Sequence, residues 1–193
     1  IVWPLTGVAV EEVPARPAIA VKVENTAAAR PQSGLEDADI VWETIVEYEV
    51  SRFIAVFNSN LPKEVGPVRS ARPVDLRVVT PANPLFVFSG AQKKMVQRIA
   101  KSDVQAISHD AGAAGLSRSS ARRAPHNVYA NLETIIKAAD AEHSAAPAQQ
   151  FTYAADAGTA SAAATGTDTK TISLNMSAAA KPSWQWSKDA WKR

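Results

Sequence analysis

Two segments rich in β-branched and aromatic residues, 40–47 and 51–58, flank a short polar link around Tyr48 and Glu49. Such residues favour strands, and so short a link favours an antiparallel hairpin. Upstream, residues 19–24 alternate between β-branched side chains and Ala, Lys or Glu, which is the period of two that a strand shows. These three segments predict that a β-sheet forms the centre of the fold.

Helical patterns follow the hairpin. Ser70 is a suitable N-cap for a helix that continues until Pro81 or Pro84. The remaining elements expected from periodicity are a strand at 85–89, an amphipathic helix at 91–101, a strand at 104–107, an irregular stretch at 109–123 and a helix at 131–142. The predicted fold class is therefore α/β or α+β, with a mixed β-sheet, an antiparallel hairpin and packed helices.

The composition changes at His143, where Ala, Ser, Thr, Gly and Asp begin to dominate. Small polar residues cannot offset the entropy lost on ordering, so residues 143–168 are predicted to form a mobile or loosely packed linker. Phe151 and Tyr153 are expected to dock within it as a short strand.

The tail concentrates three tryptophans, Trp184, Trp186 and Trp191. This density is typical of the edge of a small β-rich domain. We therefore expect a principal domain at 1–142, the linker, and the start of a C-terminal β-rich domain at 169–193.

Composition excludes several classes of function. The chain has 193 residues, of which 46% are hydrophobic, enough to bury a core. Lys and Arg number 21 and Asp and Glu 19, a net charge of +2, so no global charge favours nucleic acid or an anionic membrane surface. Cysteine is absent, which excludes disulfides and thiol nucleophiles. The sequence leaves the oligomeric state open.

The strongest candidate site is the segment GPVRSAR at 66–72, which places Arg69 and Arg72 three positions apart around Ser70. Guanidinium groups stay charged and present a planar fork of donors that suits phosphate or carboxylate. A helix beginning here would add its own unpaired N–H groups. The alternative interpretation is a pair of surface arginines on a solvated helix face.

A second basic segment, 118–127, contains Arg122, Arg123, His126 and Asn127. It is a candidate to complete the arginine site. His126 could act as an acid, a base or an anion ligand, because its ordinary pKa lies near neutrality, and Asn127 could supply a neutral donor. The alternative is that His126 only satisfies backbone groups near a helix start.

Acidic residues form a third group. Glu43, Glu47 and Glu49 share a parity, so in a regular strand their carboxylates would lie on one face and could bind a cation or meet Arg52 and the arginine pair. The alternative is a solvated sheet face. Metal-binding spacings such as H-E-x-x-H are missing, as are the G-x-S-x-G, Walker and G-x-G-x-x-G motifs, so we predict no metal and no cofactor. We predict no functional role for His109 and His143.

Five segments occur in a fixed order: PLTGVAV at 4–10, ARPAIAVKVENTAAARPQSGLEDADIVWE at 15–43, SRFIAVFNS at 51–59, GPVRSAR at 66–72 and RRAPHNVYAN at 122–131. Together they resemble the YerB-like lipoprotein family, a bacterial envelope family also described as DUF3048, a domain of unknown function. The resemblance covers residues 4–142. Residues 171–193 resemble the opening of that family's smaller C-terminal domain, so the chain is expected to be truncated or incompletely covered at Arg193.

The resemblance implies an exported protein at the outer face of the cytoplasmic membrane. It implies a signal peptide and a lipid-modified Cys upstream of this chain, and that anchor would be the only contact with the membrane. No apolar run in the chain approaches the roughly 18 to 20 residues that a membrane helix needs.

Two functions remain open, because the family itself has no assigned activity. The first is an envelope-anchored extracellular module that holds an anionic ligand, such as a cell-wall polymer or its lipid-linked precursor, through the two basic segments. The second is a phosphoryl or glycosyl transferase or hydrolase in which His126 or a carboxylate moves the proton. A carboxylate or His126 within reach of a pocket that the arginines line would favour catalysis, and arginines alone would favour binding.

Overall fold

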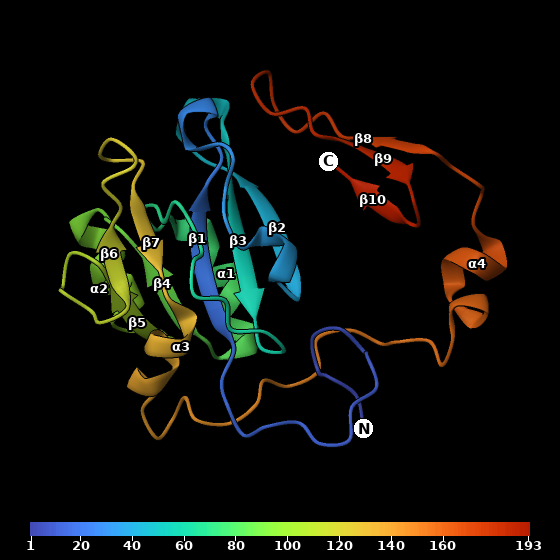
Figure 1. Cartoon of the computed structure of the whole chain (residues 1–193), viewed down its shortest axis with the longest axis horizontal. Coiled ribbons are helices and arrows are strands. Elements are labelled where there is room, and N and C mark those ends of the chain that lie inside the picture. The colour runs from blue at the N-terminus through green and yellow to red at the C-terminus, as the bar shows by residue number, and fades with distance from the viewer.

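A five-stranded mixed sheet in the order β2-β3-β1-β4-β5 forms the centre of the computed structural model, which describes residues 1–193 (Figure 1). Strands β2, β3 and β1 pair antiparallel, whereas β1, β4 and β5 pair parallel. The mixed sheet and the hairpin expected from the sequence are confirmed. The strands span Ile19–Glu24 (β1), Ile40–Ile45 (β2), Ser51–Phe57 (β3), Leu85–Phe88 (β4) and Gln105–Ser108 (β5).

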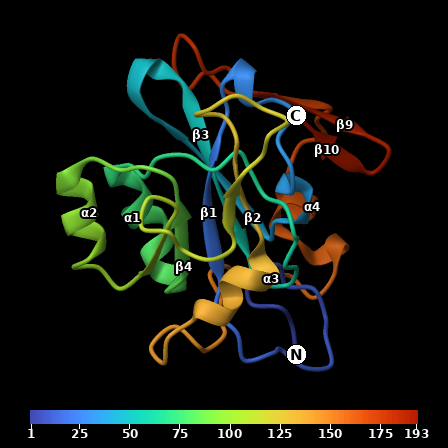
Figure 2. The same ribbon diagram turned by 60° about the vertical axis from the view of Figure 1, so that its left-hand side comes forward.

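Both faces of the sheet are covered (Figure 2). Helices α1 (Pro73–Val79) and α2 (Lys93–Ile99) pack on one face. Helix α3 (Leu132–Ile135) and the antiparallel pair of β6 (Leu116–Arg118) and β7 (Val128–Ala130) pack on the other. The double cover explains why every residue of β1 is buried, including the Lys and Glu that would face water in a sheet with one open face.

The core divides into two clusters according to the strand alternation. On the α3 side it contains Ile19, Val21, Phe53, Ala55, Phe57, Leu85, Val87, Leu132 and Ile135. On the side of α1 and α2 it contains Ala18, Ala20, Ile54, Val56, Phe86, Leu76, Val79, Met95 and Ile99. The period-two pattern of the sequence thus sorts side chains between two hydrophobic layers.

The remaining elements are short. The 3-10 helices are Ala27–Ala29 (η1), Leu35–Asp37 (η2), Glu47–Glu49 (η3), Thr80–Ala82 (η4), Ile136–Ala138 (η5) and Ala157–Thr159 (η6). Helix α4 (Ser161–Thr165) is exposed throughout and stands apart from the sheet in Figure 1. No helix has the length and apolarity needed to cross a bilayer.

The C-terminal segment forms its own antiparallel sheet in the order β10-β9-β8. Its strands are Thr171–Ser173 (β8), Ser183–Ser187 (β9) and Ala190–Lys192 (β10). It contacts the main body through Arg193, whose Nη2 lies 2.6 Å from Glu43 Oε1, and through the Ser177 hydroxyl, which donates to the Glu49 carbonyl at 2.5 Å. The tryptophan-rich tail is thus a β-structure, as its composition predicted.

Four expectations about local structure are wrong. Helix α1 begins at Pro73 with Arg72 as its N-cap, not at Ser70, because the backbone before it is tied to strands: Arg69 N–H donates to the Lys22 carbonyl and Ala71 N–H to the Gly90 carbonyl. The irregular stretch at 109–123 contains strand β6, which pairs with β7.

The helix expected at 131–142 is shorter, because α3 ends at Ile135 and only the turn η5 continues to Ala138. The Gln105 side chain binds this end through the Ala138 carbonyl and the Asp140 N–H. The strand expected at Phe151 and Tyr153 is absent as well. Tyr153 instead donates to the Pro4 carbonyl at 3.2 Å, and the Phe151 ring centroid lies 6.4 Å from that of Trp42.

Gly34, in the segment before the hairpin, combines a positive φ with a close approach to another part of the backbone. Its φ is +78°, and a Cβ there would lie 2.7 Å from the Glu64 carbonyl oxygen. Gly112 has a similar φ of +75° with open space around it. We expect Gly112→Ala to cost about 1 kcal/mol and Gly34→Ala about 2 to 3 kcal/mol, measured by urea unfolding. Equal losses at the two positions would contradict the close approach at Gly34.

Candidate functional site

The face of β1 that contacts α1 and α2 changes from apolar to charged along the strand. Ala18 and Ala20 belong to the hydrophobic cluster, whereas Lys22 and Glu24, next on the same face, are 0% and 1% exposed. Opposite Glu24 in the register lies Arg52 on β3. The charged positions therefore lie at the carboxyl end of β1, beyond the hydrophobic cluster that contains Ala18 and Ala20.

Lys22 and Asp75 form a buried ion pair between β1 and α1. Lys22 Nζ lies 2.7 Å from Asp75 Oδ1, and both side chains are 0% exposed. Burial lowers the pKa of Lys22 and raises the pKa of Asp75, and in both cases the attraction between the two charges opposes the shift. The second carboxylate oxygen of Asp75 accepts from the Arg72 N–H at 2.7 Å. The pair fixes the start of α1 against the sheet.

The segment GPVRSAR crosses the carboxyl ends of β1 and β4. Glu24 N–H donates to the Pro67 carbonyl and Arg69 N–H to the Lys22 carbonyl, while Ser89 N–H donates to the Arg69 carbonyl. These backbone bonds place the Arg69 side chain beside Glu24, with Arg69 Nε 3.3 Å from Glu24 Oε2. This contact is a charge contact and not a hydrogen bond, because the Nε–H finds no aligned acceptor.

A pocket of about 520 Å³ opens over these residues. Its lining combines three arginines, two glutamates and one histidine with four uncharged residues. The lining residues are Glu24, Thr26, Glu47, Tyr48, Val50, Arg52, Arg69, Arg72, Gln92 and His126. We call this cavity the arginine pocket. Its guanidinium groups outnumber its carboxylates by three to two, so it favours an anionic ligand.

Arg52 is the most buried arginine of the pocket. It is 8% exposed, and its Nη1 donates to the Ser70 carbonyl at 3.1 Å, but its buried Nε has no hydrogen-bond partner. Burial, followed by repulsion from Arg72 and Arg69, lowers the pKa of Arg52. Buried polar groups are generally paired, and an unpaired donor costs free energy. An anion in the pocket would relieve both the repulsion and the desolvation of this guanidinium.

Glu24 and His126 form a pair at the same pocket. His126 Nδ1 lies 2.8 Å from Glu24 Oε2, and the other oxygen, Oε1, accepts from the Thr26 hydroxyl at 2.9 Å. A carboxylate on one ring nitrogen orients the imidazole and fixes which nitrogen carries the proton. This leaves Nε2 to face a further partner, which is the arrangement found in general bases and in anion-binding histidines.

Arg72 and Glu47 close the other side of the pocket. Arg72 Nε lies 2.6 and 2.7 Å from the two oxygens of Glu47, whose side chain is 44% exposed. Although burial acts to raise the pKa of Glu47, the hydrogen bonds from Arg72 and the backbone hold that pKa below its usual value. Glu47 thus occupies with its own carboxylate a position that an anionic ligand could take.

The structure brings together only part of the residues singled out by sequence. Arg69, Arg72 and His126 line the arginine pocket together with Arg52 and Glu47. Glu47 pairs with Arg72, whereas Arg52 is repelled by Arg69 and Arg72. Ser70 contributes its carbonyl oxygen to Arg52 and is absent from the lining. Arg122 binds the carbonyls of Ala28 and Pro31, so it anchors a loop instead of facing the pocket.

Asn127 and Arg123 also lie outside the pocket lining. Asn127 is 7% exposed, accepts from Arg118 at 2.7 Å and donates to the carbonyls of Ser119 and Arg122. Its role is to hold the loop that carries His126. Arg123 is exposed, and its carbonyl accepts from the His126 N–H.

The shared strand face proposed for the three glutamates does not form. Glu43 lies on β2, but Glu47 and Glu49 lie in the turn η3, where Tyr48 and Glu49 have positive φ values. Glu43 instead accepts from the Ser51 hydroxyl and binds Arg193, away from the arginine pocket. The positive φ values break the alternation on which the parity argument depended.

The other titratable candidates lie elsewhere. His143 is 7% exposed and binds Asp140 at 2.7 Å, and His109 lies 3.4 Å from Asp110. No three His, Asp or Glu side chains converge as a metal site would require.

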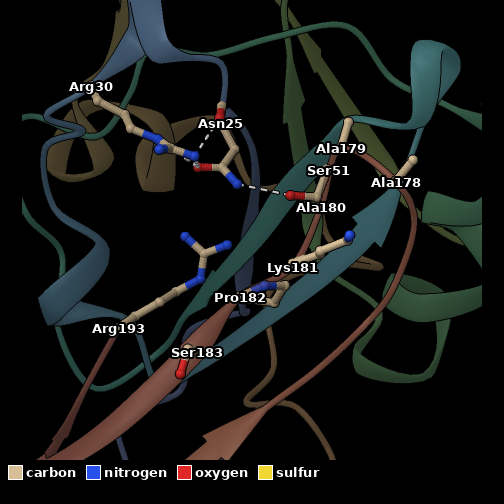
Figure 3. Close-up of a pocket in the computed structure, with 10 residues that line it drawn as sticks. All are labelled: Asn25, Arg30, Ser51, Ala178, Ala179, Ala180, Lys181, Pro182, Ser183 and Arg193. Carbon is tan, nitrogen blue, oxygen red and sulfur yellow. Dashed lines mark hydrogen bonds between the residues drawn. The ribbon is translucent and has the colours of Figure 1, made fainter.

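A second concavity of about 450 Å³ lies between the main body and the C-terminal segment (Figure 3). Arg30, Lys181 and Arg193 line it, together with Asn25, Ser51 and residues 178–183. Arg30 is already bound to the Asn25 side chain and carbonyl, and Arg193 to Glu43. Because two of its three charged groups, Arg30 and Arg193, are already bound by protein groups, this cavity is a weaker candidate for ligand binding than the arginine pocket.

Sequence reasoning missed Glu24 and Lys22 as members of the site and named Arg52 only as a partner. Lys22 and Glu24 follow the period of two, and that pattern predicts only the strand at 19–24. One signal in the sequence could have revealed their burial. The strand that contains this Lys and Glu is followed by enough predicted helices to cover both faces of the sheet. Buried charges of this kind need partners and so mark a polar cluster.

Comparison with known proteins gives one consistent match. The family described as "Protein of unknown function (DUF3048) N-terminal domain" matches residues 5–145. The Bacillus subtilis (strain 168) protein named "Putative lipoprotein YerB" is 38% identical over 141 residues, which cover 71% of this chain and 42% of that protein. The family match at residues 5–145 includes every residue that lines the arginine pocket.

A solved structure, the crystal structure of YerB protein from Bacillus subtilis, matches with a TM-score of 0.69 and 34% sequence identity. The match covers 77% of this chain and 52% of that chain. The chain therefore spans about half, or less, of the length of the proteins it matches.

Proposed function

This chain belongs to the family of DUF3048 N-terminal domains, as its five ordered motifs predicted, and we propose that it binds a phosphate- or carboxylate-bearing ligand in the arginine pocket. The relative is named "Putative lipoprotein YerB", and this name supports the proposal that the protein is exported and held at the membrane by a lipid anchor. An anionic component of the cell envelope, such as a wall polymer or its precursor, is the ligand that fits this location.

One observation carries the proposal. Arg52 is 8% exposed, sits against two further guanidinium groups and keeps a buried Nε–H without an acceptor. A fold stabilised only by its own ion pairs would supply a carboxylate to each buried guanidinium. Here Glu24 contacts Arg69 and Glu47 binds Arg72, so no carboxylate binds Arg52 directly. A ligand oxygen is the partner that this geometry lacks.

A second candidate function is supported by the Glu24–His126 contact. Because the oriented imidazole and the arginines line one pocket, the same site could move a proton while the guanidinium groups stabilise charge on a phosphoryl or glycosyl substrate. Turnover would be detected as product formed from a phosphosugar or phosphodiester by phosphorus NMR. His126→Gln should then abolish turnover while binding persists, whereas binding without any product favours the first function.

The binding proposal is tested by thermal shift with the intact chain. The probes are inorganic phosphate, glycerol 3-phosphate, a phosphorylated glycan and glucuronate. A ligand at 100 times its dissociation constant should stabilise the wild type by about 2.7 kcal/mol. Arg69→Ala combined with Arg72→Ala should lose this stabilisation, because two of the three guanidinium groups of the pocket are then removed.

Arg77→Ala is the matched control, since Arg77 is an exposed arginine on α1 outside the pocket lining. It should respond to the probes as the wild type does. Equal stabilisation of the double variant and the wild type would remove the arginine pocket as the binding site. A wild type that responds to none of the four probes would overturn the proposal.

A further inference from the structure

The arginine pocket does not end at Arg72. A neighbouring cavity of about 310 Å³ shares Glu47, Arg72 and Gln92 with it. Its remaining lining residues are Ala71, Pro73, Lys94, Met95 and Arg98. We call this cavity the α2 pocket. Because three residues belong to both cavities, the two form one continuous depression with the Arg72–Glu47 ion pair at the junction.

The α2 pocket is also cationic. Lys94 and Arg98 lie four positions apart on α2, so their side chains project from the same face of the helix. With Arg72 they give three cationic groups against the single carboxylate of Glu47. Neither Lys94 nor Arg98 forms an ion pair with a protein carboxylate. The positive charge of the arginine pocket therefore continues along the surface toward α2.

Glu47 occupies the junction with its own carboxylate, bound through both oxygens to Arg72. It is carried by the turn η3, where Tyr48 and Glu49 have φ values of 60° and 59°, and Tyr48 is 93% exposed. A turn with few buried contacts can shift at low cost in free energy. An anionic group of a ligand could therefore replace Glu47 on Arg72.

We infer that the ligand is an extended polyanion, with one anionic group held by Arg52 and Arg69 and a following group held by Arg72, Lys94 and Arg98 in place of Glu47. The inference rests on the proposed anion-binding function and specifies its ligand class: a flexible chain with repeated phosphate or carboxylate groups. Tyr48 is the only Phe, Tyr or Trp that lines either pocket, so neither pocket offers a row of such side chains for stacking bases, and a polymer without bases fits better than nucleic acid.

The first test compares inorganic phosphate with a short-chain inorganic polyphosphate by isothermal titration calorimetry on the intact chain. The wild type should bind the polyphosphate at least tenfold more tightly, because a second charged site is engaged without a second loss of translational entropy. Lys94→Ala combined with Arg98→Ala should weaken polyphosphate binding by roughly tenfold and leave phosphate binding unchanged. Lys93→Ala combined with Lys101→Ala removes the same charge from exposed positions outside the lining and should have little effect.

The second test uses a variant that is expected to bind more tightly than the wild type. A gain in affinity cannot result from a variant that fails to fold. Glu47→Gln removes the competing carboxylate and should tighten polyphosphate binding by roughly threefold to tenfold. Glu49→Gln, two residues away and outside both linings, removes an equal charge and should change the affinity less.

The outcomes separate the two proposals. If phosphate binding depends on Arg69 but chain length, Lys94, Arg98 and Glu47 make no difference, the extended ligand is wrong and the anion-binding function stands. If the binding of neither phosphate nor polyphosphate depends on Arg69 and Arg72, both the extended ligand and the anion-binding function are wrong. Single-stranded oligothymidine bound as tightly as polyphosphate of equal charge would overturn the choice of a polymer without bases.

Discussion

Asp75→Asn is expected to destabilise the protein by about 3 to 5 kcal/mol, because it leaves the charge of Lys22 buried without its partner. Both side chains of the wild-type pair are 0% exposed, and Lys22 Nζ has only the Thr44 hydroxyl, at 3.1 Å, as a second partner. Asparagine keeps the side-chain volume and an oxygen for the Arg72 N–H, so the change isolates the lost charge. Urea unfolding measures the difference in free energy of unfolding.

The pH dependence of this variant has a definite sign. Burial already lowers the pKa of Lys22 in the folded state, and the loss of Asp75 removes the group that opposes this shift. The folded variant then binds fewer protons than the unfolded chain, so its stability should rise with pH up to the unfolded pKa of about 10.4. The deficit relative to the wild type should therefore be smaller at pH 9 than at pH 7.

The control for this prediction is Lys22→Met in the Asp75→Asn background. It removes the unpaired charge and should recover a large part of the lost stability, because buried ion pairs can be replaced by apolar groups at little cost. If Asp75→Asn alone had the same urea midpoint of unfolding as the wild type, the pair would not be buried as described.

Phe86→Ala is expected to cost about 3 to 5 kcal/mol, since it opens a cavity at the centre of the cluster under α1 and α2. The Phe86 side chain is 0% exposed, and its ring centroid lies 5.3 Å from that of Phe88. The same cluster supports the strands whose carboxyl ends carry the arginine pocket. Urea unfolding with an unchanged m-value would show that the loss comes from the folded core.

Val96→Ala provides the comparison for Phe86. Val96 lies on α2 but is 49% exposed, so its truncation should change the free energy of unfolding by no more than about 0.5 kcal/mol. A loss at Val96 equal to that at Phe86 would contradict the packing of α2 on the sheet. Because neither residue lines either pocket, any Phe86→Ala protein that remains folded should retain anion binding.

Much of the fold was accessible from local sequence patterns. The hairpin of β2 and β3 followed from two β-rich segments with a short link, and β1 and β4 followed from apolar periodicity. Helix starts and ends were less predictable, because long-range partners decided them. Ser70 lacks a helix because its neighbours bond to β1 and to the Gly90 carbonyl, and α3 ends early where Gln105 binds the chain.

The candidate site divides in the same way. GPVRSAR and His126 could be selected because their residue types suit anions, but no local pattern distinguishes Arg122, which binds loop carbonyls, from Arg69, which lines the pocket. Glu24 was not predicted as a pocket residue, and Arg52 was predicted only as a charge partner, because the alternation of a strand does not show which of its charged side chains are buried. Their burial depends on cover supplied by segments far along the chain.

The sequence by itself determined the residue chemistry, the strand segments and the family of this protein, because these depend on side-chain type and on neighbours a few positions away. The tertiary structure alone decided which charges meet. The pocket residues Glu24, Arg52, Arg69, Arg72 and His126 come from four separate segments. They converge because backbone pairing aligns the ends of β1 and β3 with the GPVRSAR segment and the 118–127 loop. Contacts across such separations depend on the packing of the whole domain, which local patterns do not contain.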